Sequence, residues 1–275
     1  RSAGQLSNRY GKIEDIVAGV EVVLADGTVV RTGGAPKAAV GPDLTQLFVG
    51  SEGTLGVVTS AQLRVRPAPE AEARAAYGFA SWGAGMDACR RILRRGSNTA
   101  VLRLYDAIES DRSHGTGELN VLLVMDEGDP RTVETNMAIV AEECGAAAVL
   151  DESLVARWFE HRNDVTALES LTRNGFVVDT MEIAAPWGRL DAIYSATIEA
   201  LSSVEGVRAA SAHQSHAYTD GACLYFSFAG RPPEGDRDAF YVRCWDVGTR
   251  TVLDNGGALS HHHGVGLHRS RFVAG

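Results

Sequence analysis

Cysteine is scarce in this sequence, and the few cysteines are scattered. The 275 residues include four cysteines, at positions 89, 144, 223 and 244, and none of them forms a C-x-x-C pair. Small secreted domains that are held together by disulfides carry many cysteines at close spacing. The sequence therefore does not indicate a disulfide framework, and we expect a reducing, cytoplasmic location.

Long apolar runs and an excess of positive charge are also missing. No run reaches the roughly 18–20 apolar residues that a membrane span needs, and no signal peptide opens the sequence. Lysine and arginine number 26 against 35 aspartates and glutamates, which gives a formal net charge of −9. Such a chain repels a nucleic-acid backbone or an anionic membrane surface except where the charge is locally inverted. We therefore expect no nucleic-acid partner, and allow a basic pocket for one small anion.

The N-terminal part alternates apolar residues around a turn. Asp26-Gly27 is a dipeptide that tolerates positive φ and favours a two-residue hairpin turn. Asp43 is placed to cap one or two helical turns, and Pro67 ends a β-branched stretch. Proline and charge interrupt the pattern at 67–75, where we expect a domain boundary. The strands expected in this part lie near 15–25, 28–32 and 55–67.

The remainder of the sequence mixes further strands and helices. Asp129, Pro130 and Gly145 mark the N-cap, the first turn and the end of one well-defined helix. Strands that follow one another locally, without a regular βαβαβ alternation, predict an α+β fold with mainly antiparallel sheets. We expect strands within 99–106, 118–129, 146–151, 175–183, 206–215 and 222–230, and helices within 85–97, 129–145, 186–201 and about 236–254.

Two stretches near the N-terminus could lie against a ligand. VGSEGTLGVV, at 49–58, has glycines that let a backbone approach a ligand closely, while Ser51 and Thr54 offer hydroxyls. RSAGQLSNRYGKIEDIV, at 1–17, fits a loop near a polyanion or a tight turn. Taken singly, each is equally well a structural turn or loop, and neither a G-x-G-x-x-G nor a P-loop motif is present.

Together these stretches resemble a known family. RYGKIEDIVAGVEVVLADGTVVRTG, followed by GPDLTQLFVGSEGTLGVVT, resembles the end of the FAD-binding domain of FAD-linked oxidases, the vanillyl-alcohol oxidase and p-cresol methylhydroxylase superfamily. The resemblance implies FAD as the cofactor. The residues that it places against the flavin are Arg1, Ser2, Ala3, Glu52, Gly53, Thr54, Leu55, Gly56, Val57 and Val58. The glycine-rich pyrophosphate loop of that domain is not in the sequence, so we expect a chain without the N-terminal part of the domain.

Three consecutive histidines, His261, His262 and His263, stand between Gly256-Gly257 and a Gly-x-Gly exit. Adjacent strand residues point to opposite faces, so we expect His261 and His263 to share a face while His262 points away. This geometry disfavours a metal site, and we expect none; the internal, glycine-framed position disfavours a tag remnant. Two imidazoles on one face can hold an anion or relay a proton near neutral pH. A structural role is an equal alternative.

Tyr225 lies in ACLYFSFAG, an apolar stretch that is typical of a strand. From the residues alone, Tyr225 is a half-buried strand residue with a satisfied hydroxyl. GACLYFSFAG followed by NGGALSHHHGVG nevertheless resembles the alkyldihydroxyacetonephosphate synthase branch of the same superfamily. That resemblance implies that Tyr225 is the catalytic acid or base and that His261, His262 and His263 are essential. It also implies that Arg103, in TAVLRLYD, is an active-site arginine.

The resemblance implies a reaction without net redox. Tyr225 would take a proton from the carbon beside the carbonyl of an acylated ketone phosphate, flavin N5 would hold the fragment while the acyl group leaves, and a long-chain alcohol would replace it. We expect Arg103 and a histidinium to lower the pKa of Tyr225 from about 10. The arginine that binds the phosphate in this branch has no counterpart at the matching position of this sequence. Leu168 occupies that position, and neither Arg162 nor Arg173 aligns with it.

Two other functions stay open: a flavin-dependent oxidase or dehydrogenase of a hydroxy acid or alcohol, and a truncated, non-catalytic binding module. We expect the C-terminal part of the FAD-binding domain at 1–68, a cap domain with an antiparallel sheet flanked by helices at 69–254, and an active-site histidine segment at 255–275. The implied partners are a small-molecule or lipid-like substrate, a peripheral membrane contact and a second copy in a homodimer.

Overall fold

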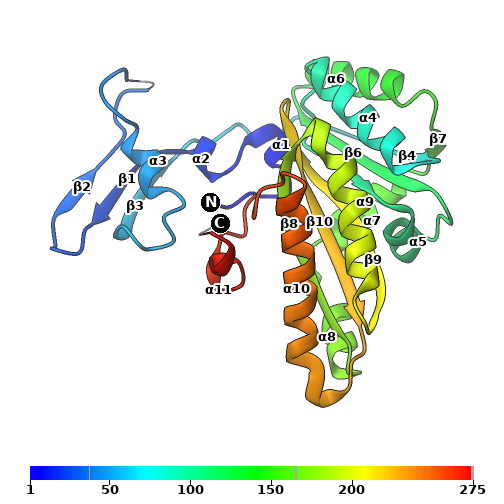
Figure 1. Cartoon of the computed structure of the whole chain (residues 1–275). Helices are drawn as coiled ribbons and strands as arrows, with labels where there is room; N and C mark the ends of the chain where they lie inside the picture. Colours follow the sequence, from blue (N-terminus) through cyan, green and yellow to red (C-terminus); the bar gives the residue numbers. More distant parts are fainter. Residues whose placement is uncertain (37, 165, 274–275) are drawn as a thin grey trace.

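The computed structural model describes residues 1–36, 38–164 and 166–273, and contains two separate sheets. Figure 1 shows a small three-stranded sheet at some distance from a seven-stranded sheet that carries most of the helices. Every strand pair in both sheets is antiparallel. The predicted α+β class with antiparallel sheets is therefore confirmed. Among the described residues, no helix is both long and apolar enough to cross a bilayer.

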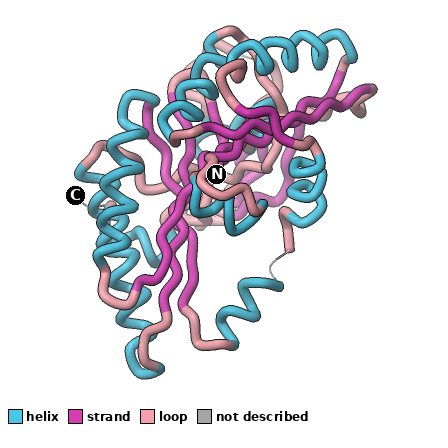
Figure 2. Tube along the Cα trace, turned by 90° about the vertical axis from the view of Figure 1, so that its right-hand side faces the viewer, coloured by secondary structure: helices cyan, strands magenta, loops and turns pink. Residues whose placement is uncertain are grey.

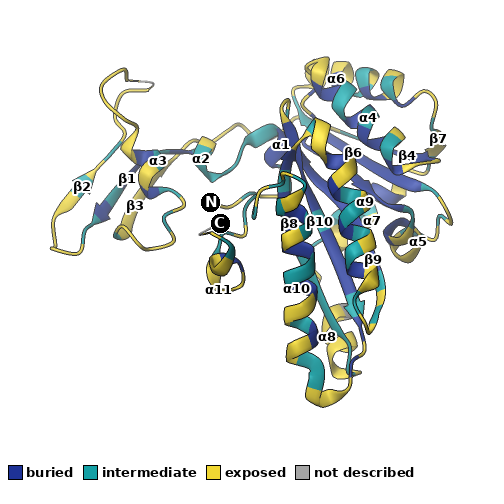
Figure 3. Cartoon of the chain, in the orientation of Figure 1, coloured by how far each residue is buried: buried dark blue, intermediate teal, exposed yellow. Residues whose placement is uncertain are grey.

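The small sheet is built around the predicted hairpin. Its strands, in the order β2-β1-β3, are β1 (Val17–Val23), β2 (Val29–Arg31) and β3 (Val57–Leu63). The hairpin is present, but the expected two-residue turn is wrong: the Leu24 amide donates to the Thr28 carbonyl and the Gly27 amide to the Leu24 carbonyl, so residues 25–27 form a three-residue loop with Gly27 at a φ of 85°. Asp26 accepts a hydrogen bond from the Thr28 amide within this loop. Asp43 caps α3 (Leu44–Phe48), as predicted, by accepting from two amides of its first turn. β3 is an edge strand that is exposed along its whole length (Figure 3).

The large sheet has the strand order β7-β4-β6-β5-β9-β10-β8. Its strands are β4 (Ala71–Phe79), β5 (Val101–Tyr105), β6 (Asn120–Gly128), β7 (Ala148–Leu150), β8 (Val177–Pro186), β9 (Val207–Ala217) and β10 (Gly221–Gly230). β4 was not predicted, because Glu72 and Arg74 interrupt the apolar pattern. These two side chains form an ion pair at the partly exposed start of the strand.

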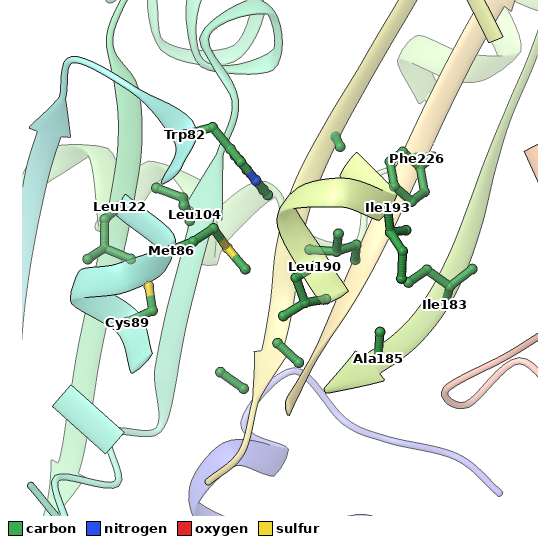
Figure 4. Packing of buried hydrophobic residues seen from close by; sticks show 14 of the residues in the cluster. Trp82, Met86, Cys89, Leu104, Leu122, Ile183, Ala185, Leu190, Ile193 and Phe226 are labelled. Atoms are coloured by element: carbon green, nitrogen blue, oxygen red, sulfur yellow. The ribbon is translucent and has the colours of Figure 1, made fainter. Parts of the chain in front are cut away.

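Four helices cover one face of the large sheet and form the main core with it. They are α4 (Trp82–Arg94), α6 (Pro130–Glu143), α9 (Trp187–Ser203) and α10 (Arg237–Asp254). Figure 4 shows Met86 and Cys89 of α4 beside Leu104 and Leu122, and Ile193 of α9 beside the strands at its right. Asp129 caps α6 with Pro130 in its first turn, as predicted.

The other face of the sheet is covered in part by elements that were not predicted. These are α1 (Ser7–Tyr10), α5 (Ala107–His114), α7 (Ser153–His161) and α8 (Thr166–Arg173). α2 (Ile13–Ile16), also not predicted, packs against β1 of the small sheet. Two turns, α11 (Gly266–Arg269) and a 3-10 turn at 270–272, follow the histidines. Leu154 and Val155 of α7 pack on β4, β5 and β6. Helices thus lie on both sides of the strands, as the turned view in Figure 2 shows.

The N-terminal segment is joined to the large sheet by a buried ion pair. Asp126 on β6 is fully buried and accepts from the Arg9 guanidinium at 2.6 Å. The same carboxylate also accepts from the Ala100 amide and from the side-chain amide of Asn136. A buried carboxylate with this many donors is stable only while its charged partner stays in place. Asp126 therefore fixes α1 against the sheet on which the site is built.

We predict that Asp126→Ala lowers the free energy of unfolding by about 3–5 kcal/mol, because the Arg9 charge and two other donors lose their acceptor. Urea denaturation followed by circular dichroism measures the change. Asp129→Ala, which removes an exposed helix cap, is the control and costs about 1 kcal/mol. Equal losses in the two variants would contradict the assigned role of the ion pair.

Candidate active site

A row of polar side chains crosses four strands of the large sheet. Tyr225 on β10 lies opposite Glu182 of β8 on one side and His213 of β9 on the other, and His213 lies opposite Tyr105 of β5. Directly opposed residues of neighbouring strands share a face. Their chain neighbours, such as Ile183 and Leu224, belong to the core beneath the helices. The row therefore lies on the face away from that core.

A β-bulge adds a second histidine to this face. Cys223 pairs with His216 and Leu224 pairs with Gln214, so β9 carries Ser215 as an extra residue. Without the bulge, His213 and His216 would point to opposite faces because they are three residues apart. With it, both lie on the face of Tyr225. Nδ1 of His216 is 2.9 Å from the Ser7 hydroxyl of α1.

Arg103 is held by three side chains of the same face. Its guanidinium donates to the Tyr105 hydroxyl at 2.7 Å and to the Ser215 hydroxyl at 3.0 Å, and its Nη2 lies 2.6 Å from Nε2 of His213. A guanidinium can only donate, so Nε2 of His213 accepts and Nδ1 carries the proton. That Nδ1 donates to Glu109 at 2.8 Å. The tautomer of His213 is thus set by Arg103 and Glu109.

Charge and burial oppose each other in this group. Burial favours the neutral acid of Glu109, but the hydrogen bond from His213 and the charges of Arg112 and Arg103 lower its pKa. Burial and the Arg103 charge lower the pKa of His213. The result is an ionised Glu109, a neutral His213 and an oriented Arg103 guanidinium.

Tyr225 contacts the histidine run rather than Arg103. Its hydroxyl lies 2.7 Å from Nε2 of His262 and 3.3 Å from Nε2 of His263, and its ring stacks on His213 at 4.8 Å. Burial raises the pKa of Tyr225, and the nearby Arg103 charge only reduces that rise. The expectation of a lowered pKa is therefore wrong, because loss of water around the phenol outweighs the arginine.

The histidine run does not form a strand, so the expected alternation is wrong. Residues 260–263 bend around the Glu182 carboxylate, and both His262 and His263 reach Tyr225. His261 instead stacks on His216 and Tyr218, and its Nδ1 lies 2.9 Å from Nδ1 of His262. The strand rule assigned His262 to the wrong side because the backbone here follows a carboxylate and not a neighbouring strand.

The clustered histidines are neutral near pH 7. Burial is the main cause, and it lowers the pKa of His261 to about 3, of His262 to about 4 and of His216 to about 2. The expected histidinium is therefore not formed by these rings. Nitrogen atoms of His216, His261 and His262 lie within 4.8 Å of one another, as do ligand atoms of Glu182, Cys223 and His262. The strand argument against a metal is thus wrong, and the absence of a metal stays a prediction.

The segment predicted to contact the flavin approaches the histidine run from the small sheet. Glu52 accepts from the Val265 amide at 2.9 Å and from the Gly266 amide at 3.3 Å. It holds this position with a φ of 51°, a left-handed conformation that is rare outside glycine. The two amides lower the pKa of Glu52. The side chain of Glu52 therefore connects the SEGTLG turn to the histidine segment.

The exposed part of this turn is suited to a flat cofactor. Gly53 has a φ of 79° and no atom near the position of a Cβ, so its backbone is open to direct contact. Leu55, Val57 and Val58, next to it, expose 42%, 68% and 50% of their surface. An open backbone beside exposed apolar side chains fits an aromatic ring system such as the isoalloxazine of FAD.

The chain start lies beside the same turn. Arg1 donates to the carbonyls of Val49 and Gln46 at 3.2 Å, and a Cβ on Gly50 would meet its side chain. The Ser2 carbonyl accepts from the Ile13 amide, and Ala3 is partly exposed next to it. Arg1 is thus brought beside the predicted flavin segment, in which Thr54 and Gly56 complete the turn. The flavin contacts of Arg1, Ser2 and Ala3 stay predictions.

Comparison with known proteins places the chain in a family. The family model for the C-terminal domain of FAD linked oxidases matches residues 68–274 of the sequence. The chain belongs to the FAD-linked oxidases. It is 30% identical to the uncharacterized FAD-linked oxidoreductase YgcU of Escherichia coli K12, over 98% of this chain and 60% of that protein. FAD as the cofactor and the resemblance to this family are thereby confirmed.

Two further matches concern the synthase branch. The chain is 27% identical to the alkyldihydroxyacetonephosphate synthase of Dictyostelium discoideum, over 96% of this chain and 49% of that one. A solved alkyldihydroxyacetonephosphate synthase structure superimposes with a TM-score of 0.78 at 24% identity, over 98% of this chain and 54% of that one, which shows a shared fold. The chain thus spans about half to three fifths of the length of these proteins.

Sequence reasoning did not identify several residues that complete the site. Glu182, Glu109, His213 and Ser215 were given no role, although HQSH places polar residues within an otherwise apolar strand. Polar side chains in a buried strand require partners, so this pattern is a usable signal. The expected domain limits at 68/69 and 254/255 stay predictions. Ala258 forms a bridge with Ala184 of β8, so the histidine segment is attached to the large sheet.

Burial of neutral histidines makes stability depend on pH. The pKa of His216 is about 2 in the folded chain and about 6.5 in the unfolded chain, so only the unfolded state gains this proton as pH falls below 6.5. We predict that from about pH 5.5 to 4 the free energy of unfolding falls less steeply in His216→Gln than in the wild type, by about 1.4 kcal/mol per pH unit.

Urea denaturation at a series of pH values measures these slopes. His161→Gln is the matched control because His161 is exposed on the last turn of α7, and it should keep the wild-type slope. A His216→Gln slope equal to that of the wild type would show that His216 takes up its proton in the folded state.

Proposed function

We propose that the whole protein acts as an alkyldihydroxyacetonephosphate synthase does, exchanging the acyl group of an acylated ketone phosphate for a long-chain alcohol. The observation that supports this most is the Tyr225 hydroxyl between the imidazoles of His262 and His263. Such a group can take a proton from a carbon and return it. The matches to synthases of the same name support the choice of reaction.

The resting protonation states define how Tyr225 works. A phenol of raised pKa keeps its proton, so the hydroxyl donates to Nε2 of the neutral His262. Nδ1 of His262 then carries the other proton and donates to Nδ1 of His261. Tyr225 can therefore accept a substrate proton only as it passes its own proton to His262. His262 is the acceptor that makes Tyr225 a base.

Arg103 supplies positive charge to the same face. Three of its five N–H groups are used by Tyr105, Ser215 and His213, which leaves two for a substrate oxygen. FAD, when bound, supplies an electrophilic ring that can hold the substrate carbon while a leaving group departs. The segment that includes Gly53, Leu55 and Val57 would hold it. Arg103 would orient the substrate and stabilise negative charge on its oxygen.

The phosphate of this substrate is supported least. Arg162 donates to the Phe159 carbonyl, and Arg173 pairs with Glu169 in an exposed turn of α8, so neither is directed at the Tyr225 face. Leu168 is exposed on the same helix. The proposal therefore rests on the proton-transfer group and not on a phosphate contact.

The second candidate is a flavin-dependent oxidase or dehydrogenase of a hydroxy acid or alcohol. The relative YgcU, which is called an oxidoreductase, favours it. The pair of Tyr225 and His262 could equally remove the hydroxyl proton of an alcohol while the carbon is oxidised. Anaerobic mixing of the whole protein with candidate substrates separates the two functions. Loss of the flavin absorption near roughly 450 nm at the end of the reaction supports the oxidoreductase, and unchanged absorption with product formation supports the synthase.

We predict that Tyr225→Phe in the whole protein lowers turnover by at least about 1000-fold, within the range attributed to an acid or base catalyst, and leaves the flavin content unchanged. Turnover assays and the visible spectrum measure the two effects. Tyr77→Phe, a buried phenol on the core face of β4, is the matched control and should keep its activity. Full activity of Tyr225→Phe would rule out this role for Tyr225.

A further inference from the structure

The histidine run is ordered by a single buried carboxylate. Glu182 has no exposed surface and accepts hydrogen bonds from the Ser260 hydroxyl at 2.5 Å, the His261 amide at 2.5 Å and the His263 amide at 2.9 Å. These three donors lie within residues 260–263, a stretch that belongs to no helix or strand. The carboxylate therefore takes the place of the backbone acceptors that a regular element would provide.

Glu182 acts on the backbone of the run and not on its rings. The nearest ring nitrogens, Nδ1 of His263 and Nδ1 of His262, lie 3.7 and 4.0 Å from its oxygens, beyond hydrogen-bonding distance. Both rings instead direct their Nε2 atoms to Tyr225. Because Glu182 is the register partner of Tyr225 on the neighbouring strand, the carboxylate and the phenol are fixed to the same frame.

We infer that Glu182 is the positioning residue of this site: its carboxylate folds residues 260–263 so that His262 meets the Tyr225 hydroxyl. Its effect on turnover rests on the proposed function, whereas its effect on the position of His262 does not.

Arg269 makes burial of this carboxylate tolerable. It is 5% exposed, and its Nη2 lies 3.4 Å from a Glu182 carboxylate oxygen and 3.2 Å from the Glu182 backbone carbonyl. Nη1 donates to the Gly264 carbonyl directly after the histidines. A buried ionised carboxylate requires a partner charge and several donors, and Glu182 has both. Arg269 also ties the far end of the run to the same carboxylate.

The other side chains that hold the histidine segment bind different backbone atoms of it. Lys12 donates to the His261 carbonyl at 2.6 Å, and Glu52 accepts from the Val265 and Gly266 amides. Neither accepts from the amides of His261 and His263. Within the part of the chain that the structure describes, Glu182 is thus the side chain that fixes the backbone direction of the three histidines.

Diethyl pyrocarbonate labelling, mapped by mass spectrometry, tests the inference without a substrate. The His262 side chain is 9% exposed, so it reacts slowly in the wild type. Glu182→Gln places an amide donor against the donors of the run, so we expect His262 to react at least about tenfold faster once these charge-assisted bonds are lost. His213, with a side chain that is 7% exposed on the sheet itself, should keep its wild-type rate.

Two variants complete the experiment. Asp179→Asn removes a carboxylate from the same strand, but one that accepts from Tyr241 and Trp245 of α10, and it should leave His262 protected. Ser260→Ala removes one donor to Glu182 and the acceptor of the Gly264 amide without touching the sheet, and should raise the rate at His262 by about threefold. The effect should be smaller than that of Glu182→Gln because the His261 and His263 amides keep their acceptor. The whole, flavin-loaded protein is used for all variants.

The outcomes are decisive in each case. Faster labelling of His262 in Glu182→Gln and Ser260→Ala, with His213 unchanged, supports the inference. Unchanged His262 labelling in Glu182→Gln overturns it, as does an equal effect of Asp179→Asn.

If Glu182→Gln exposes His213 as well, the sheet has loosened and Ser260→Ala alone decides. If Tyr225→Phe proves fully active, the proposed function fails while the labelling still reports on Glu182. Otherwise kcat of Glu182→Gln should fall at least about tenfold with KM within about twofold.

Discussion

The alternation of side chains along β8, β10 and β9 is the constraint on which the site depends. Ile183, Leu224 and Phe226 point into the helix-covered core, and this leaves Glu182 and Tyr225 on the other face. A slip of one residue in any of these strands would put a carboxylate or a phenol into an apolar core. The same packing that stabilises the domain thus fixes which groups can meet on its far side.

Three structural features then bring the polar groups of this face together. The bulge at Ser215 adds His216 to the face of His213, and the Glu109 carboxylate fixes His213 so that Arg103 has one orientation. The third feature is the bent histidine segment, which returns over the sheet and is held between Glu182 and Glu52. Because Glu52 lies in the turn before β3 of the small sheet and Glu182 lies on β8 of the large sheet, the segment connects the predicted flavin surface to Tyr225 and His262, the proposed proton-transfer pair.

Local signals in the sequence predicted most local features. The caps at Asp43 and Asp129 depend on residues within three positions, and both have the expected geometry. The Asp26-Gly27 hairpin is present, but its loop has three residues instead of two. α5 was missed although Asp106 caps it through the Glu109 amide, a spacing that the sequence displays. The orientation of the histidines could not be predicted this way. It is set by Glu182, which lies 78 to 81 residues earlier in the chain, and no periodic pattern encodes that contact.

Burial of Tyr225 and His262 changes the protonation states that the sequence resemblance led us to expect. A lowered tyrosine pKa would have required more positive charge near the phenol than Arg103 supplies, and burial keeps His262 and His213 beside Tyr225 neutral. The same loss of water that keeps the proton on Tyr225 keeps Nε2 of His262 free to receive it. Neither group is a strong base alone. In the proposed function, proton removal from a substrate is therefore shared along the hydrogen bond between them, and the geometry of that bond matters more than the pKa of either residue.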